Sequence, residues 1–281
     1  MQYTRTSAAL AALVCALGLG LSGCGGGGGG DDGVSGTGGG TGGGGTGGGA
    51  SPTTPTNSGS PEGFWCGTDS NGYVDNIVVL SNGTVWGIYA SGNCNSLSLN
   101  PLGAGTFNGG AFHGSVTSGG NGVTGTVREF YFSNGGSTQL TVSGTALAKD
   151  TLNITLSDAT TLRANYSAQY DQPATLAAVA GTYSGPAVVS VDGGLVANVT
   201  ISASGAITMP ADAYGCSATG TIAPHGSVGL YDVSVTFHGA ACSLGNGGTA
   251  TGIAVLKGRQ LQSLAVTSSG LTGFFYVGNK Q

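Results

Sequence analysis

The sequence predicts an all-β fold in which residues 61–281 form two tandem small antiparallel β-barrels. Apolar and polar side chains alternate with a period of two over many short segments, for example over residues 195–202 and 231–238, as expected for strands with one buried face. Turn signals rich in Asn and Gly, such as residues 81–83 and 133–135, recur about every ten residues. Short strands joined by tight turns are typical of meandering sheets that close on themselves.

An internal repeat divides this folded part in two. Residues 63–67 and 181–185 share the form Gly-x-aromatic-x-Gly, and each is followed by an apolar segment and a turn. Eleven residues then separate a turn glycine from a cysteine in both halves, from Gly83 to Cys94 and from Gly205 to Cys216. Three shared features in the same order indicate a duplicated unit.

The repeat predicts two independent β domains, residues 61–172 and residues 173–281. The single helix-like stretch of the folded part, residues 174–180, follows this boundary and is at most two turns long. We expect about eight strands in each barrel.

Two β-sandwich domains are the alternative, since about 110 residues suit either architecture. The cysteine spacing argues against an immunoglobulin-like sandwich. Cys66 and Cys94 are too close in sequence to bracket Trp86 as the disulfide of such a sandwich does.

One irregularity is expected inside the first domain. The apolar positions change phase near residues 128–129, from Val123 and Val127 to Phe130 and Phe132. An extra residue inserted in one strand shifts every following side chain to the other face. The change of phase therefore predicts a β-bulge.

The first 23 residues have the features of a secretory signal peptide. Arg5 supplies a positive charge, and residues 8–20 form an apolar run rich in small residues and too short for a stable membrane span. The run ends in Leu21-Ser22-Gly23-Cys24, which resembles the lipobox of bacterial lipoproteins. The resemblance implies cleavage before Cys24 and lipid attachment (acylation, including palmitate) at that cysteine. Gly rather than Asp at position 25 implies export to the outer membrane of a Gram-negative cell.

Residues 24–60 combine the lipidated cysteine with a disordered tether. Residues 25–60 contain 19 glycines, and Val34 is their one sizeable apolar side chain, so nothing offsets the entropy of ordering. A flexible coil of this length spans roughly 30 Å. The run of six glycines after Cys24 resembles the tether of Gram-negative surface lipoproteins of the Neisseria transferrin-binding and factor-binding type. That resemblance favours display at the cell surface, with the periplasmic leaflet of the outer membrane as the alternative, and in both cases the membrane is bound through the lipid.

A second resemblance concerns the start of each barrel. A short helix followed by Gly-x-aromatic, as in residues 178–183, resembles the opening of lipocalin-like barrels. In those barrels the aromatic residue plugs the closed end, so the resemblance implies the same position for Tyr183.

The cysteines predict two disulfides. Cys15 leaves with the signal peptide and Cys24 carries lipid, so an oxidising compartment leaves Cys66 with Cys94 and Cys216 with Cys242. A zinc site is the alternative in the second domain, from Cys216, His225, His238 and Cys242. The spacing of these four residues matches no compact ligand motif, so we expect no metal and no cofactor. His113 has no evident partner, and we expect it at the surface.

Charge and catalytic motifs exclude several functions. The net charge is −5, with 7 Lys and Arg against 12 Asp and Glu, so no basic surface exists to bind nucleic acid. No Gly-x-Ser-x-Gly or His-Glu-x-x-His motif occurs, and no close pair of carboxylates lies on one predicted face. With three His and two Glu in the chain, general acids and bases are few. We therefore expect a protein that is not an enzyme.

The expected function is a surface binding or interaction module for a protein or glycan partner. A lipocalin-like carrier of a small apolar ligand is the alternative and requires a hollow barrel, and an envelope hydrolase is the second alternative. Residues 61–172 hold Trp65, Trp86 and 12 of the 19 aromatic residues of the folded part. Most of these aromatic residues are expected in the core. Because aromatic residues also anchor interfaces, we expect the first domain to carry the binding activity.

Overall fold

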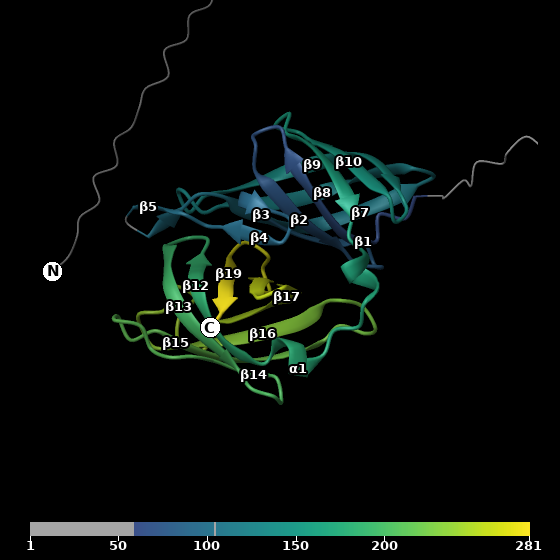
Figure 1. Ribbon diagram of the computed structural model, residues 1–281. Coiled ribbons are helices and arrows are strands. Elements are labelled where there is room, and N and C mark those ends of the chain that lie inside the picture. The colour runs from purple at the N-terminus through teal and green to yellow at the C-terminus, as the bar shows by residue number, and fades with distance from the viewer. Residues whose placement is uncertain (1–58, 104) are drawn as a thin grey trace, which may run out of the picture. The chain divides into compact units, whose positions relative to one another are not determined.

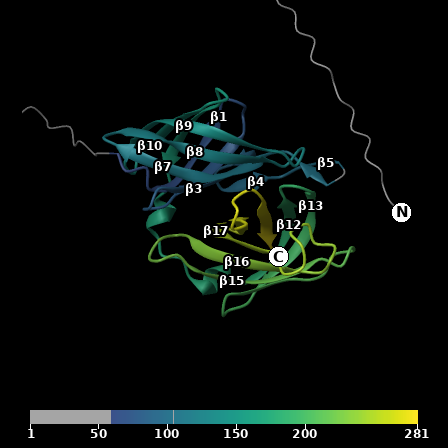
Figure 2. The same ribbon diagram turned by 180° about the vertical axis from the view of Figure 1, so that it is seen from behind.

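The computed structural model describes residues 59–281 apart from residue 104. The predicted signal peptide, Cys24 and nearly all of the tether therefore lie outside the described residues. The described part is an all-β fold with two closed, eight-stranded antiparallel barrels, which confirms the predicted fold class over the sandwich alternative. Both barrels belong to one compact unit and are seen from two sides in Figure 1 and Figure 2.

The first barrel is a meander closed by the pairing of its first strand with its last, β1 with β11. A short insertion between β3 and β7 contains β4 (Ser96–Ser98), β5 (Pro101–Gly103) and β6 (Thr106–Phe107). The barrel strands are β1 (Gly63–Asp69), β2 (Val74–Val79), β3 (Thr84–Asn93), β7 (Gly110–Gly119), β8 (Gly122–Tyr131), β9 (Ser137–Leu147), β10 (Thr151–Leu156) and β11 (Thr161–Tyr166).

The second barrel is an uninterrupted up-and-down meander closed by β12 and β19. Its lumen is lined by the alternating residues that the sequence predicts, with Ala197, Val199 and Ile201 buried and their neighbours exposed. The strands are β12 (Gly181–Val189), β13 (Gly193–Ile201), β14 (Ala206–Met209), β15 (Ser217–Pro224), β16 (Tyr231–His238), β17 (Thr249–Lys257), β18 (Gln260–Val266) and β19 (Gly273–Lys280).

Two short helices connect the barrels. A 3-10 helix, η1 (Ala168–Asp171), is followed by the predicted helix, which is a single turn, α1 (Leu176–Val179). Thr175 caps α1 by accepting a hydrogen bond from the Ala178 backbone N–H. Within the described part of the chain, no helix is long and apolar enough to cross a membrane.

The aromatic residue of each repeat motif closes the base of its barrel. Trp65 and Tyr183 are fully buried. The Trp65 indole N–H donates to the Pro61 carbonyl at 2.8 Å, and the Tyr183 hydroxyl donates to the Val179 carbonyl at 2.7 Å. Each ring therefore fills the lumen while its polar atom bonds to the carbonyl four residues earlier.

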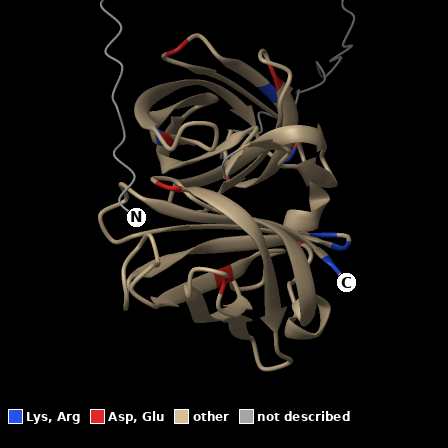
Figure 3. Ribbon diagram, turned by 90° about the vertical axis from the view of Figure 1, so that its left-hand side faces the viewer, with Lys and Arg blue, Asp and Glu red and all other residues tan. Residues whose placement is uncertain are grey.

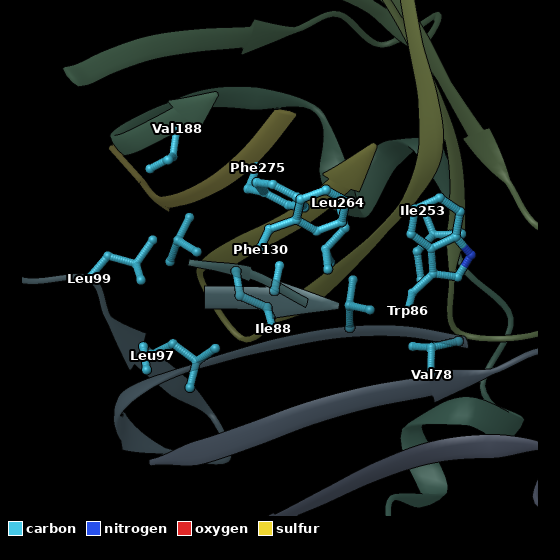
Figure 4. Close-up of a cluster of buried hydrophobic side chains, with 14 of the residues drawn as sticks. Val78, Trp86, Ile88, Leu97, Leu99, Phe130, Val188, Ile253, Leu264 and Phe275 are labelled. Atoms are coloured by element: carbon cyan, nitrogen blue, oxygen red, sulfur yellow. The ribbon is translucent and has the colours of Figure 1, made fainter. Parts of the chain in front are cut away.

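The outer faces of the two barrels share a buried apolar cluster, which we call the junction cluster. It joins β1, β2, β3 and β8 of the first barrel to β17, β18 and β19 of the second (Figure 4). The Phe275 ring lies 5.3 Å from Phe130 and 5.1 Å from Phe132, measured between centroids. The members of the junction cluster that Figure 4 labels are Val78, Trp86, Ile88, Leu97, Leu99, Phe130, Val188, Ile253, Leu264 and Phe275.

Amide side chains cross the junction as well. The Asn76 amide donates to Gln262 at 3.0 Å. The Gln260 side chain accepts from the Leu97 N–H at 2.8 Å and donates to the Leu97 carbonyl at 2.9 Å. Because these groups are buried, their hydrogen bonds fix how one barrel packs on the other.

The β-bulge predicted at residues 128–129 is wrong. β8 keeps a continuous register with both neighbours, and Glu129 lies opposite Phe112 on one side and Thr138 on the other. The apolar phase changes because Val127 faces the lumen, whereas Phe130 faces outward into the junction cluster. β8 is therefore a regular strand whose lumen-facing side is apolar in its first half and whose outward-facing side is apolar at its end.

Candidate functional site

The lumen of each barrel is filled by side chains. The cavity left among the lumen residues of the second barrel is about 30 Å³, and that of the first is about 20 Å³. One water needs about 10–15 Å³ by the same kind of measure, whereas sites for small organic ligands are about 300–1,000 Å³. Neither described lumen holds an apolar ligand of that size.

An open pocket of about 260 Å³ lies at the mouth of the first barrel. Strand alternation points the deepest polar residues of this pocket into the barrel. On β2, Asp75 lies on the same face of the strand as Ile77 and Val79, which face the lumen. Glu129 continues the inward phase of Val127 on β8 in the same way. The lining is completed by Asp69, Asn71, Tyr73, Tyr89, Leu102, Asn108, Gly109, Phe112, Tyr131, Ser133, Leu156, Asp158 and Thr160.

The carboxylates at the rim of this pocket are occupied by turns. Asp69 accepts hydrogen bonds from the backbone N–H groups of Asn71 and Tyr73, both at 2.9 Å. Asp158 accepts from the Thr160 N–H at 3.0 Å and from its hydroxyl at 3.1 Å. These contacts are ordinary turn chemistry, so the rim carboxylates have a structural explanation.

The two deep carboxylates are not fully partnered. Asp75 is 5 % exposed and Glu129 is 9 % exposed. The Tyr89 hydroxyl donates to Glu129 Oε1 at 2.6 Å. Asp75 Oδ2 and Glu129 Oε2 are buried and have no hydrogen-bond partner, although buried charges are normally paired.

Burial changes the acidity of this site. It raises the pKa of the Asp75 carboxyl well above its usual range, and the Asp69 and Glu129 carboxylates raise it further. Burial also raises the pKa of the Tyr89 phenol, with a further contribution from Glu129. Tyr89 therefore remains a hydrogen-bond donor.

Aromatic rings form much of the pocket wall. The Tyr73 and Tyr89 ring centroids are 5.4 Å apart, and those of Tyr89 and Phe112 are 6.4 Å apart. A β-carbon at Gly87 would collide with the Phe112 ring, and one at Gly110 would collide with the Tyr89 hydroxyl. Glycine at these two positions leaves room for the rings.

The pocket is acidic without a compensating cation. Four carboxylates line it, and none of its described lining residues is Lys, Arg or His. Charged residues are sparse over both barrels (Figure 3). In the described part of the chain, no group of three or more His, Cys, Asp or Glu is arranged to hold a metal ion.

The mouth of the second barrel is a wider groove of about 690 Å³. Its carboxylate Asp212 accepts hydrogen bonds from the backbone N–H groups of Tyr214 and Cys216, at 2.8 and 2.9 Å. Tyr214 and Val196 line it and are 80 % and 67 % exposed. This groove has apolar rim residues but no deep unpartnered carboxylate among its described lining residues.

Both predicted cysteine pairs lie at disulfide distance. Cys66 is joined to Cys94 at an S–S distance of 1.98 Å, and Cys216 to Cys242 at 2.00 Å. Two of the four residues of the zinc alternative, Cys216 and Cys242, bond to each other. His225 instead contacts the Asp232 carboxylate at 2.7 Å.

His113 lies partly buried against Trp86, contrary to the expected surface position. The two rings stack with centroids 3.9 Å apart, and His113 Nδ1 is 3.1 Å from the Val85 carbonyl oxygen. Burial lowers the pKa of this imidazole. Trp86 and Trp65 are both buried, so neither tryptophan is an exposed anchor.

Sequence reasoning missed the deep carboxylates. It found no pair of carboxylates on one predicted face, but β2 and β8 bring Asp75 and Glu129 to the same mouth. A signal was present in both strands. Each carboxylate continues an inward apolar phase, where a hydrophobic residue is expected.

Comparison with known proteins does not assign the chain to a family. Neither the protein-family models nor the curated proteins that were compared with the chain give a match.

Proposed function

We propose that this protein is an outer-membrane lipoprotein, anchored through Cys24, that acts as a surface binding module for a protein or glycan partner. The mouth of the first barrel is its recognition site. One observation carries the proposal: the lumens retain only about 20 and 30 Å³, whereas the mouth of the first barrel opens into about 260 Å³ lined by four carboxylates, two of which have a buried oxygen without a partner. Recognition at a barrel mouth suits this distribution of space.

The filled lumens separate this proposal from the alternative of a lipocalin-like carrier. A carrier encloses its ligand, and the lumens provide no such space. Incubation with cis-parinaric acid provides the test, since its fluorescence rises in an apolar cavity. We expect no saturable rise for the full chain. A stoichiometric rise that is displaced by fatty acid supports the carrier.

The anchor has its own test. Radiolabelled palmitate is expected to enter the wild-type protein in a Gram-negative host and not a Cys24→Ala variant. Protease added to intact cells is then expected to remove the labelled protein's folded part, because the glycine run after Cys24 resembles the tether of surface lipoproteins. Equal labelling of both variants rules out the anchor at Cys24.

Recognition is tested with a panel of immobilised glycans and extracellular proteins. The full chain carrying Cys24→Ser, which lacks the lipidated cysteine, is compared with the same chain carrying Leu102→Ser. Leu102 is 61 % exposed at the rim of the pocket, so its substitution changes the recognition surface and spares the core. We expect binding to a panel member that Leu102→Ser weakens and that Leu271→Ser, at another exposed apolar position, leaves unchanged. Binding that Leu102→Ser does not change moves the recognition site elsewhere.

A further inference from the structure

We infer that the pocket at the mouth of the first barrel binds an organic cation, a primary ammonium or a guanidinium group, between Asp75 and Glu129. This inference rests on the proposed function, because it names the chemistry that the proposed recognition site takes. The source of the group is a lysine or arginine side chain of a protein partner, or a free small amine.

The pocket contains two carboxylate oxygens that accept no hydrogen bond. Asp75 Oδ2 and Glu129 Oε2 are buried without partners, and leaving such groups unsatisfied costs about 1–3 kcal/mol or more each. The rim carboxylate Asp69, by contrast, is satisfied by its own turn. Tyrosine hydroxyls are the side-chain donors to Glu129, from Tyr89 to Oε1 and from the neighbouring Tyr131, so the two oxygens without partners can still accept from a bound ammonium or guanidinium group.

The charge of the pocket favours a cation. Among its described lining residues the pocket contains four carboxylates and no basic side chain, so it attracts cations and repels anions. Its carboxylates are not arranged to hold a metal ion. The tyrosine and phenylalanine rings beside Asp75 and Glu129 favour an organic cation instead, since their faces stabilise ammonium and guanidinium groups.

The second barrel has a different residue at the position that matches Asp75 in the internal repeat. Asp75 lies eight residues before the turn glycine Gly83, and Ala197 lies eight residues before Gly205. Both residues face a lumen mouth from the second strand of a barrel. Because the second barrel closes with alanine at this position, the fold itself does not require a carboxylate there. Asp75 is therefore a departure from the shared scaffold, as expected of a functional residue.

The size of the pocket fits a side-chain-sized group. A volume of about 260 Å³ is just below the usual range for drug-sized ligands. Leu102 stands exposed at the rim, where it can contact whatever carries the cation. A cationic group in the pocket with its carrier across the rim is the arrangement that we infer.

The experiment is isothermal titration calorimetry on the full chain carrying Cys24→Ser. The probes are n-butylammonium and n-butylguanidinium, with n-butanol as the neutral analogue and calcium chloride as the metal control. We expect saturable binding of at least one organic cation and none of n-butanol or calcium. Absence of cation binding overturns the inference, as does equal binding of n-butanol or binding of calcium alone.

Matched variants locate the binding. Asp75→Asn and Glu129→Gln are each expected to weaken cation binding roughly tenfold or more, since each removes a charged acceptor. Asp192→Asn, at the mouth of the second barrel, is the control and is expected to bind as the wild type does. Because a folding defect could imitate the loss, thermal unfolding of each variant is recorded alongside. Folded Asp75→Asn and Glu129→Gln variants with wild-type affinity overturn the inference.

The source of the cation is resolved with peptides. Blocked Gly-Arg-Gly and Gly-Lys-Gly are titrated beside the free amines. Tighter binding of a peptide identifies a protein side chain, and tighter binding of the free amine identifies a small molecule; both support the site. If the glycan and protein panel gives a hit that depends on Leu102 while no cation binds, the proposed function stands and the cation inference fails.

Discussion

The two barrels have the same scaffold and different mouths, and the difference follows from where each places its disulfide and its charges. The Cys216–Cys242 bond lies at the mouth of the second barrel, where Cys216 lines the groove. In the first barrel Cys66 faces outward into the junction cluster, so its bond to Cys94 leaves the mouth open. The open mouth holds the deep carboxylates Asp75 and Glu129.

The two barrels share the features that stabilise them and differ at the mouths, at one of which we propose recognition. Both lumens are apolar and filled, and both bases are closed by an aromatic ring whose polar atom bonds to an upstream carbonyl. Those shared features hold each barrel closed. The features that differ lie at the mouths, where loops and strand ends vary without disturbing the lumen.

The largest expected effect comes from the junction cluster. Phe275 is 1 % exposed and contacts the first barrel, while its neighbour Phe274 faces the lumen of the second. Phe275→Ala is expected to destabilise the protein by about 3–5 kcal/mol, as for other buried phenylalanines. Trp65 lies in the lumen of the first barrel and Trp86 in the junction cluster, so urea unfolding followed by tryptophan fluorescence in a Trp86→Phe background reports on the first barrel.

This measurement also tests whether the halves are independent domains. If the junction cluster couples them, Phe275→Ala in the second barrel lowers the tryptophan-reported midpoint of the first. Independent halves, as the repeat predicts, leave that midpoint unchanged while circular dichroism shows a second, earlier transition. Phe274→Ala is the matched control for damage confined to the second lumen.

The disulfides are expected to have the next largest effect. They close loops with sequence separations of 28 and 26 residues, so the loop-entropy model gives about 3–4 kcal/mol for each. Cys216→Ser with Cys242→Ser is expected to loosen the mouth of the second barrel and leave cation binding at the first intact. Urea midpoints and the titration of n-butylguanidinium check both parts. A loss of cation binding in this double variant contradicts the separation of the two mouths.

Much of the fold was accessible from the sequence because strand alternation and turn residues are local signals. Two features were not. In β8 the alternation of apolar residues predicted which positions are buried. It did not show that the second barrel buries Phe130, or that Glu129 faces the pocket. The deep carboxylates could not be paired from the sequence either, since β3 and β7 lie between their strands and only the closed sheet brings them to one mouth.

Substitutions at the two matched repeat positions, Asp75 and Ala197, are expected to change the free energy of unfolding in opposite directions. Asp75→Asn removes a buried unpaired carboxylate and is expected to stabilise the protein by about 1–3 kcal/mol at pH 7. Ala197→Asp places such a group in the second barrel and is expected to destabilise it by a similar amount. Urea unfolding of both variants beside the wild type measures the difference. A destabilised Asp75→Asn protein indicates that the carboxylate has a structural partner.

Asp75 also makes the free energy of unfolding depend on pH. The pKa of Asp75 is raised in the folded state above its ordinary value of 3.8. Between these two pKa values the folded state binds more protons than the unfolded state, so the free energy of unfolding falls as the pH rises through this interval. Asp69 on β1, Tyr89 on β3 and Glu129 on β8 are the ionisable groups that act on Asp75. Asp75→Asn is expected to reduce this fall, and equal pH profiles contradict it.

The smallest expected effect concerns the one lysine buried at the junction in the described part of the chain. Lys257 is 5 % exposed, and its ammonium group lies 4.1 Å from the centre of the Phe64 ring. That contact between the barrels is a cation–π interaction, which offsets part of the cost of burying the charge. Burial nevertheless lowers the pKa of Lys257 to about 8.

Lys257→Met tests which of these two effects is larger. With a folded-state pKa of about 8 against an ordinary 10.5, the folded state binds fewer protons than the unfolded state between these values. The free energy of unfolding of the wild type therefore rises as the pH increases from about 8 to 10.5, and the full penalty is present below pH 8. Methionine keeps the apolar stem and removes the charge, so the variant is expected to be more stable at pH 7 by about 1 kcal/mol and to lose this rise. A less stable variant shows that the contact with Phe64 outweighs the desolvation of the ammonium group, and that the junction is held partly by charge.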